Sequence, residues 1–266
     1  MTRPAIPQYL LKQLGTALCL LLACCLAGPG ARAQKLRIVT IESAPFGFFD
    51  ETGKPAGMMY EIGNLIAQEA GFAYTNKIVP YPRTVALIAS GEADLALRYS
   101  NPELRAAAIQ VAQVLSLQTI VVGRAGVQLG SLQDLHGKYV GIPRGGRFDE
   151  GFDADHAIHK YPVADYPQML RMLMAGRLDA GIGSSVGIYY NAHVAGIGKD
   201  KLGKPLLLSA RQFELHFSKK TASADAVAAL QQAVQRLQKR GAINEIIEKY
   251  YRTFDAGTKG KQKPAT

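Results

Sequence analysis

Two distant stretches of the chain repeat one local pattern. Residues 87–97 and residues 173–182 are each predicted to contain the end of a helix, a glycine, an aspartate and a short apolar strand, with an offset of one residue between them. Gly91 and Gly176 end the helices, because glycine adopts the left-handed conformation of a helix C-terminus without strain. Helix–glycine–strand junctions are common enough for such a match to arise by chance. The repeat nevertheless favours a chain built from two similar α/β halves.

The hydrophobic pattern predicts the other elements of these halves. Strands are expected over residues 36–41, 73–79, 94–97, 117–123, 138–142 and 179–182, and helices over residues 58–70, 83–90 and 167–175. Two apolar stripes at helical spacing follow in the last third of the chain, and we interpret both as core faces. In α/β sheets, ligands bind outside the carboxyl ends of the strands. We therefore expect one cleft where four loops converge, at residues 42–48, 98–105, 143–148 and 183–188.

The first 33 residues have the three parts of a secretory signal peptide. Arg3 and Lys12 form a positively charged region before an apolar run over residues 14–26, and a small-x-small cleavage site ends at Ala33. Cleavage after Ala33 predicts a periplasmic protein. The apolar run is short for a membrane span. Two alternatives stay open, an uncleaved anchor and a lipoprotein attached through Cys24, although the preceding sequence fits a lipid-attachment box poorly.

Cysteine positions and charge narrow the classes of function. All three cysteines (Cys19, Cys24 and Cys25) lie in the predicted signal, so the mature chain is expected to have no disulfide and no thiolate metal ligand. The signal contains three cations and no acid, so cleavage lowers the net charge from +10 to +7. Part of this charge lies in a polar tail, residues 255–266, which is predicted to be disordered. The sequence has no basic stripe with interleaved aromatic residues, so we expect no nucleic-acid partner.

Seven short motifs follow one another along the chain, at residues 44–46, 50–57, 90–94, 101–105, 132–142, 175–179 and 247–251. Their order and spacing over about residues 35–253 resemble the extracellular solute-binding proteins of the polar amino-acid ABC transporter class. The resemblance implies a type II periplasmic binding protein fold, in which two α/β lobes, each a mixed sheet flanked by helices, are joined by two hinge strands. Lobe one would comprise residues 34–120 plus 211–254, and lobe two residues 126–205, with hinge strands at 117–123 and 206–210.

The resemblance also implies a function. Such a protein captures a small polar solute, either an amino acid or an organic acid, closes its lobes over the solute and delivers it to a permease in the inner membrane. We expect a monomer that is not an enzyme and that needs no cofactor and no metal. Two alternatives stay open on the same fold. One is a sensory binding module without a permease, and the other is a lyase similar to cyclohexadienyl dehydratases, with Glu42 as the acid in the cleft.

The resemblance assigns binding roles to particular residues. Arg105 matches the arginine that grips the ligand carboxylate, and a guanidinium offers a rigid bidentate fork for such a group. Residues 145–147 match the lobe-two loop whose backbone N–H groups approach an anion. Ser184 occupies the position where amino-acid-binding members usually have an aspartate. Either Glu42 supplies the missing negative charge, or the ligand has no amine.

The predicted cleft loops are rich in arginine, including Arg144, which favours an anionic ligand such as a carboxylate or a dicarboxylate. Aromatic side chains in these loops could wall the pocket or belong to the core. The full set of expected ligand-binding residues is Glu42, Phe46, Tyr81, Arg83, Arg98, Tyr99, Ser100, Arg105, Gly145, Gly146, Arg147 and Ser184.

Two other groups of residues have competing explanations. Residues 183–187 match the nucleophile elbow of a hydrolase, with Ser185 as the nucleophile and His193, Asp200 and His216 after it. A glycine-rich chain produces this five-residue match often, and a binding protein explains the segment without catalysis. The acids and histidines of residues 153–159 could hold a metal, but a solvated helix face explains them better.

Overall fold

The computed structural model describes residues 35–256 of the 266-residue chain. The predicted signal peptide, with its cleavage site after Ala33, and residues 257–266 of the predicted tail lie outside the described residues. The tail is predicted to start at residue 255, but helix α9 (Ala242–Ala256) continues through that position. No helix in the described part of the chain combines the length and the apolar character needed to cross a membrane.

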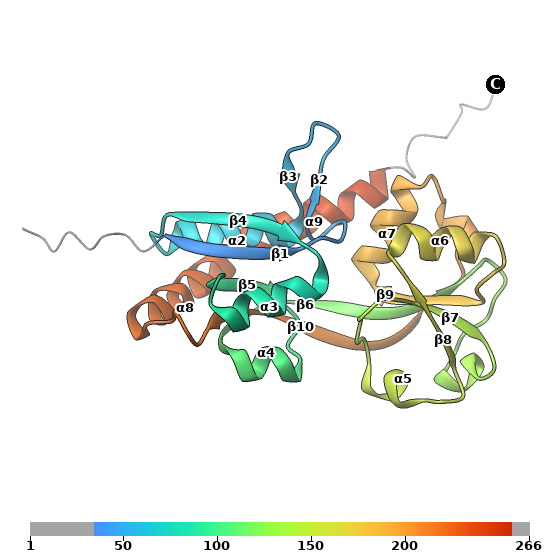
Figure 1. Ribbon diagram of the computed structural model, residues 1–266. Helices are drawn as coiled ribbons and strands as arrows, with labels where there is room; N and C mark the ends of the chain where they lie inside the picture. The colour runs from blue at the N-terminus through green and yellow to red at the C-terminus, as the bar shows by residue number, and fades with distance from the viewer. Residues whose placement is uncertain (1–34, 257–266) are drawn as a thin grey trace, which may run out of the picture. The chain divides into compact units, whose positions relative to one another are not determined.

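Eight strands are hydrogen-bonded in the order β4-β1-β5-β10-β6-β9-β7-β8 (Figure 1). In one half, β1 pairs in parallel with β4 and β5, and in the other β7 pairs in parallel with β8 and β9. Strands β1, β4 and β5 of one half therefore occupy the same places as β7, β8 and β9 of the other half, as the sequence repeat predicts. The bounds are β1 Leu36–Ile41, β4 Tyr74–Val79, β5 Leu95–Arg98, β6 Ala108–Gly123, β7 Tyr139–Pro143, β8 His159–Val163, β9 Ala180–Ser184 and β10 Leu206–Ser218, with a separate hairpin of β2 Phe48–Phe49 and β3 Pro55–Ala56.

The long strands β6 and β10 connect the two parallel units. They pair antiparallel along most of their length, and the predicted hinge segments, residues 117–123 and 206–210, lie opposite each other within them. Residues 214–217 of β10 also pair with β5, and residues 119–123 of β6 pair with β9. The two-lobed α/β fold is thus confirmed. The hydrogen bonding, however, continues from lobe to lobe through the shared strands instead of stopping between two sheets.

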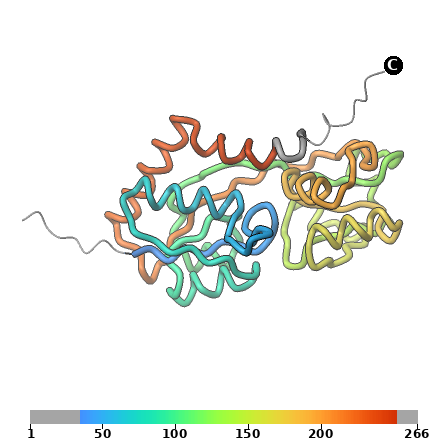
Figure 2. The backbone as a smooth tube through the Cα atoms, turned by 90° about the horizontal axis from the view of Figure 1, so that it is seen from above, coloured from blue at the N-terminus to red at the C-terminus, as the bar shows by residue number. Residues whose placement is uncertain are grey.

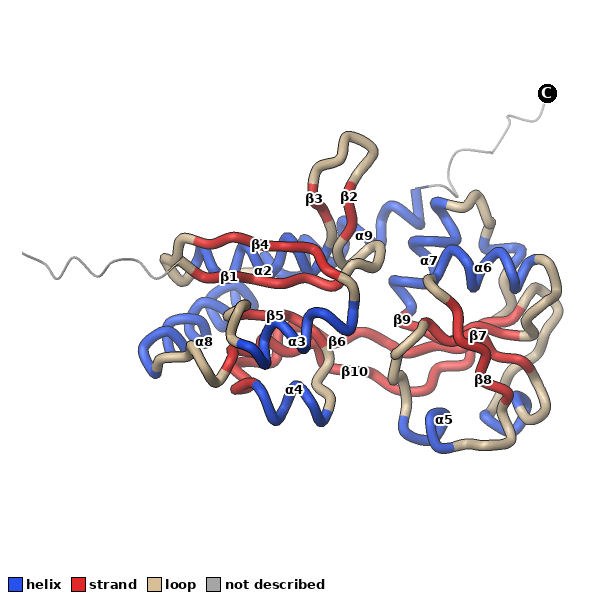
Figure 3. Tube along the Cα trace, viewed as in Figure 1, coloured by secondary structure: helices blue, strands red, loops and turns tan. Residues whose placement is uncertain are grey.

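Helices cover both faces of each half (Figures 1 and 3). In lobe one, α2 and α8 pack on one face, together with α9, and α3 and α4 pack on the other. In lobe two, α6 and α7 cover one face and α5 the other. Figure 2 shows α9 continuing from lobe one to the helices of lobe two. The bounds are α2 Met58–Glu69, α3 Tyr81–Ser90, α4 Pro102–Ala107, α5 Glu150–Ala154, α6 Tyr166–Met174, α7 Ser185–Val194 and α8 Ala224–Lys239, with 3-10 turns η1 Leu132–Leu135 and η2 Lys199–Lys201.

The repeated aspartates have the same structural role in both lobes. The Asp94 carboxylate accepts a hydrogen bond from the backbone N–H of Arg37 at 2.7 Å, and Asp179 accepts one from Tyr139 at 2.8 Å. Each aspartate thereby ties the start of the first strand of its lobe to the start of the third. The preceding glycines have positive φ, 77° at Gly91 and 72° at Gly176, which is the conformation for which glycine is selected.

The sequence prediction differs from the structure at β6, β8 and α7, among other elements. Strand β6 begins at Ala108 rather than at residue 117, and its first half, which includes exposed glutamines, lacks the continuous apolar run that predicted the second half. Strand β8 lies at the sheet edge and buries only Val163. Helix α7 starts at Ser185, inside the loop predicted over residues 183–188. Most of its residues are buried, so its sequence shows no amphipathic periodicity from which a helix could be predicted.

Candidate ligand-binding site

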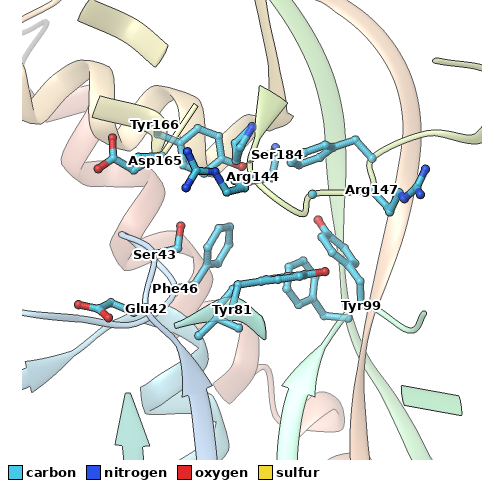
Figure 4. A pocket seen from close by; sticks show the side chains of 16 residues that line it. Glu42, Ser43, Phe46, Tyr81, Tyr99, Arg144, Arg147, Asp165, Tyr166 and Ser184 are labelled. Carbon is cyan, nitrogen blue, oxygen red and sulfur yellow. Dashed lines mark hydrogen bonds between the residues drawn. The ribbon is translucent and has the colours of Figure 1, made fainter. Parts of the chain in front are cut away.

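A cavity of about 120 Å³ lies between the lobes at the carboxyl ends of the parallel strands (Figure 4). The loops after β1, β5 and β7 and the end of β9 all contribute to its wall, so the four predicted cleft loops do meet there. A further segment, residues 164–166, follows the unpredicted strand β8. The lining residues are Ile41, Glu42, Ser43, Phe46, Tyr81, Tyr99, Pro143, Arg144, Gly146, Arg147, Phe148, Ala164, Asp165, Tyr166, Ser184 and Phe213.

The lobe-one wall is aromatic. The ring of Phe213 lies 3.9 Å from Tyr99 and 5.7 Å from Phe46, measured between ring centroids. The Tyr99 hydroxyl is buried and has no hydrogen-bond partner among the described residues, and burial raises the pKa of Tyr99 far above its usual value. This wall offers a flat apolar surface with one unused hydroxyl group.

Arg98 lies behind this wall rather than in it. Its side chain is 2% exposed, and its guanidinium carbon lies 4.3 Å from the centre of the Tyr81 ring. The guanidinium donates to the Thr84 hydroxyl and, at 3.4 Å, to the Tyr99 carbonyl oxygen. Burial lowers the pKa of Arg98. Arg98 therefore contacts the Tyr81 ring through a cation–π interaction and Tyr99 through a hydrogen bond to its carbonyl oxygen.

The lobe-two wall is polar and closely packed. Arg144 and Arg147 contribute exposed cationic side chains from the turn after β7. A Cβ at Gly146 would lie 2.3 Å from the Phe148 ring, so only glycine fits there. Gly145 has a φ of +76° and faces Tyr81 of lobe one, 3.7 Å from the position a Cβ would take.

The buried ring of Tyr166 occupies the space between two glycines. A Cβ at Gly183 would lie 2.4 Å from this ring, and one at Gly187 would lie 2.7 Å from it. The Tyr166 hydroxyl accepts a hydrogen bond from the Ser184 backbone N–H at 3.2 Å. The Ser184 hydroxyl accepts one from the Gly187 backbone N–H at 3.1 Å and so caps α7.

This packing accounts for the glycines of residues 183–187 without a nucleophile. The Ser185 hydroxyl lies 3.1 Å from the Tyr251 hydroxyl, and no histidine of the described chain hydrogen-bonds to it. His216 instead lies 3.5 Å from Glu214. The residues that match the elbow motif therefore form the junction of β9 and α7, and their glycines make room for the Tyr166 ring.

Two carboxylates border the cavity on one side. Glu42 follows β1 in lobe one, and Asp165 precedes α6 in lobe two. Both also line an adjoining cavity of about 380 Å³, whose other lining residues are Ser43, Ala44, Gly47, Phe48, Phe49, Tyr166, Pro167 and Asn191. The cleft therefore has carboxylates from both lobes near its second cavity and arginines from lobe two in its first.

Comparison with known proteins identifies the family. The sequence profile of the bacterial extracellular solute-binding proteins, family 3, matches residues 36–253. The chain belongs to this family. No match among curated proteins reaches significance.

Several solved structures have the same fold as this family 3 protein. An ancestral arginine-binding protein bound to arginine gives a TM-score of 0.69 at 19% identity, over 82% of this chain and 98% of that chain. A histidine kinase sensor domain with similarity to periplasmic binding proteins gives 0.68 at 20% identity, over 82% and 96%. The arginine-, lysine-, histidine-binding protein ArtJ from Geobacillus stearothermophilus gives 0.66 at 18% identity, over 82% and 95%. At these identities the similarity shows the fold alone.

The expected ligand-binding residues of this family 3 protein divide into two groups. One group lines the cavity: Glu42, Phe46, Tyr81, Tyr99, Gly146, Arg147 and Ser184. The other group does not line it: Arg83, Arg98, Ser100, Arg105 and Gly145.

Arg105 is the most consequential member of the second group. Helix α4 is capped by Asn101, whose side chain accepts from the Leu104 N–H at 2.8 Å. Leu104 is fully buried against the sheet, so the next residue, Arg105, faces solvent. Its guanidinium lies 3.4 Å from the Ser100 hydroxyl. Arg105 is therefore exposed, and it is not among the residues that line the cavity.

Sequence reasoning missed Ser43, Asp165, Tyr166 and Phe213 as lining residues. Ser43 lies in the loop of residues 42–48, which was predicted to face the cleft. Asp165 had a usable signal, because an aspartate two residues before a proline and before an apolar helical pattern is a helix N-cap. Its place in the cleft depends on β8, which the pattern did not reveal. Phe213 lies in β10, where nothing in the sequence marks the cleft-facing side.

The acids and histidines of residues 153–159 do not form a metal site, and no group of three or more such side chains could hold a metal ion in the part of the chain that the structure describes. Asp153 accepts a hydrogen bond from the Phe148 N–H at 3.3 Å, and burial raises its pKa. Asp155 pairs with His136 at 2.9 Å. These side chains stabilise the α5 region.

Proposed function

We propose that this protein captures a small polar, carboxylate-bearing solute, an amino acid or an organic acid, in the periplasm and delivers it to the permease of an ABC importer. The observation that carries the proposal is the cavity itself, which is lined from both lobes at the carboxyl ends of their strands. Ligands bind at this position in α/β folds. Family membership supports solute binding, and the cationic turn after β7 supports a carboxylate.

We assign the carboxylate to Arg144 and Arg147 rather than to Arg105. Both side chains line the cavity, and the Arg144 guanidinium forms no ion pair with any described residue. In Figure 4 the Arg144 side chain lies beside Ser184, whereas Arg147 extends toward the opposite end of the cavity. The proposed apolar contacts are Phe46, Tyr81 and Tyr99. Gly146 and Ser184 complete the lobe-two wall.

Substitution of Arg144 tests this assignment. A charge-assisted hydrogen bond contributes about 1.5–3 kcal/mol, so Arg144→Gln should weaken solute binding roughly 10- to 150-fold. The measurement is titration calorimetry with a solute first found by a thermal-shift screen over amino acids and organic acids, since a ligand that binds the folded state raises the melting temperature. Arg83→Gln is the matched control, because Arg83 is exposed and lies outside the cavity lining. Equal affinities of both variants and the wild type would refute the role of Arg144.

A sensory role is the second candidate. The similarity to a histidine kinase sensor domain favours it, because that protein has this fold. Uptake of the radiolabelled solute by cells with and without the gene separates the two roles. Loss of uptake supports transport, and unchanged uptake with an altered transcriptional response to the solute supports sensing.

A further inference from the structure

Two neighbouring tyrosines of α9 bind to different lobes. The Tyr250 hydroxyl donates a hydrogen bond of 2.6 Å to Glu61 Oε1 on α2, which anchors α9 in lobe one. The Tyr251 hydroxyl lies 3.1 Å from the hydroxyl of Ser185, a buried residue at the start of α7 in lobe two. Figure 2 shows the end of α9 beside the helices of lobe two. Helix α9 is therefore fixed to one lobe and hydrogen-bonded to the other at consecutive residues.

A second hydrogen bond joins α7 to lobe one. Asn191 is 4% exposed, and its Nδ2 atom donates to the carbonyl oxygens of Ala44 and Gly187, both at 2.8 Å. Ala44 lies in the loop after β1, which contributes residues to both cavities. The Tyr190 ring also lies 6.0 Å from the ring of Phe48 in the same loop, measured between centroids. Helix α7 thus contacts lobe one both at its start and further along.

The hydroxyl pair lies outside the cavities. Ser184 lines the first cavity, but neither Ser185 nor Tyr251 lines either one. Both hydrogen bonds of α7 to lobe one join atoms of different lobes, so a rotation that separates the lobes must lengthen them. Contacts of this kind stabilise the closed arrangement of the lobes. The apparent affinity of a binding protein rises with the fraction of molecules in its binding-competent arrangement.

We propose that the Tyr251–Ser185 and Asn191–Ala44 hydrogen bonds form an interlobe latch, and that Tyr251 and Ser185 are positioning residues that raise the affinity for the solute without touching it. The latch gives Ser185, the nucleophile position of the elbow motif, a role that needs no catalysis. Because its atoms belong to the protein alone, the latch changes the affinity for every solute by the same factor. This inference rests on the proposed function and adds residues that regulate the same site.

Variants that remove one hydroxyl each test the latch. Tyr251→Phe and Ser185→Ala should each weaken solute binding about 2- to 10-fold, the range expected for one neutral hydrogen bond. The loss should lie mainly in faster dissociation. The double variant should bind no more weakly than the weaker single variant, because both substitutions remove the same bond. Asn191→Ala removes the second bond, so its effect should add to that of Tyr251→Phe.

Tyr161→Phe is the matched control for the loss of a tyrosine hydroxyl. Tyr161 lies in the edge strand β8 of lobe two, is 44% exposed and lines neither cavity. Its substitution should leave solute affinity and dissociation rate at their wild-type values. Urea unfolding of every variant shows whether the fold is intact at the temperature of the binding measurements.

Two readouts separate a latch from a direct contact with the solute. Calorimetry with two chemically different amino acids or organic acids, taken from the thermal-shift screen, should give one common ratio of wild-type to Tyr251→Phe affinity. Small-angle X-ray scattering of the proteins without solute reports the lobe arrangement, and loss of the latch should enlarge the radius of gyration to the extent that the wild type is closed.

Wild-type affinity together with a wild-type radius of gyration in Tyr251→Phe and Asn191→Ala would overturn the latch and leave the proposed function intact. An affinity ratio for Tyr251→Phe that differs between the two solutes would also overturn it, because the hydroxyl would then act on the solute directly. Absence of binding by every amino acid and organic acid overturns the proposed function. The radius of gyration of the variants then decides on the latch, which an unchanged value would refute.

Discussion

His216 is a buried titratable side chain behind the binding wall of lobe one. It is 1% exposed, and its Nε2 atom lies 3.5 Å from Glu214 Oε2. Neither of these atoms has a hydrogen-bond partner among the described residues, and the same holds for Nη2 of nearby Arg98. Burial lowers the pKa of His216 to about 4, and the positive charge of Arg98 acts in the same direction. The folded protein therefore holds this imidazole neutral.

The low pKa of His216 predicts a pH dependence of stability. The unfolded chain takes up a proton near pH 6.5 and the folded chain only near pH 4, so the stability is complete above pH 6.5 and falls as the pH drops through this window. The loss should reach about 3 kcal/mol, since one pKa unit corresponds to about 1.4 kcal/mol. Urea unfolding at pH 7, 6, 5 and 4 measures it. His216→Gln should flatten the curve, and a slope identical to the wild type would contradict the prediction.

At the scale of elements, the junction of β9 and α7 depends on the contact between two glycines and Tyr166. Gly183→Ala would place a Cβ 2.4 Å from the Tyr166 ring and 2.8 Å from its hydroxyl. Overpacking of this kind costs about 1–3 kcal/mol, so this variant should unfold at lower denaturant concentration. Tyr166 and Ser184 both line the cavity, so solute affinity should fall as well.

Gly63→Ala is the control for this prediction. Gly63 lies in α2, and a Cβ there would meet its nearest neighbour at 3.6 Å, an ordinary contact. Because alanine is favoured over glycine inside helices by up to about 1 kcal/mol, this substitution should leave stability equal or higher. If Gly183→Ala proved as stable as Gly63→Ala, the packing explanation of the elbow motif would fail.

At the scale of the molecule, the two crossing strands determine where the lobes could move. Residues 115–118 of β6 and 210–213 of β10 pair only with each other, because β5 ends on one side of them and β9 begins on the other. A register irregularity lies between Phe213 and Glu214. We propose that the hinge lies in this unflanked stretch, which overlaps the predicted hinge segments only in part. The α9 helix, through the contact of Tyr251 with Ser185, links the lobes a second time.

Closure around this hinge predicts compaction on binding. The radius of gyration measured by small-angle X-ray scattering should decrease when a saturating solute is added. Arg144→Gln should need a proportionally higher solute concentration for the same change. An unchanged radius of gyration at saturation, verified by calorimetry on the same sample, would show that solute binds without lobe closure.

The sequence by itself determined the repeated unit of this protein. Helix, glycine, aspartate and strand are linked by local contacts, and the aspartates make equivalent hydrogen bonds in both lobes. Hydrophobic periodicity then located most strands and helices, because burial on one or both faces leaves a pattern in the chain. The meeting of four loops at one cleft followed from the rule that the carboxyl ends of parallel strands share an edge.

Only the tertiary structure decided which side chains face the cleft. Leu104 is buried and Arg105 is exposed outside the cavity lining, whereas Arg98 is buried against the Tyr81 ring. Asp165 reaches the cleft through an edge strand that buries too little to leave a pattern. Whether a charged side chain lines a cavity depends on the packing of elements far away in the sequence, and a local pattern carries no information about that packing.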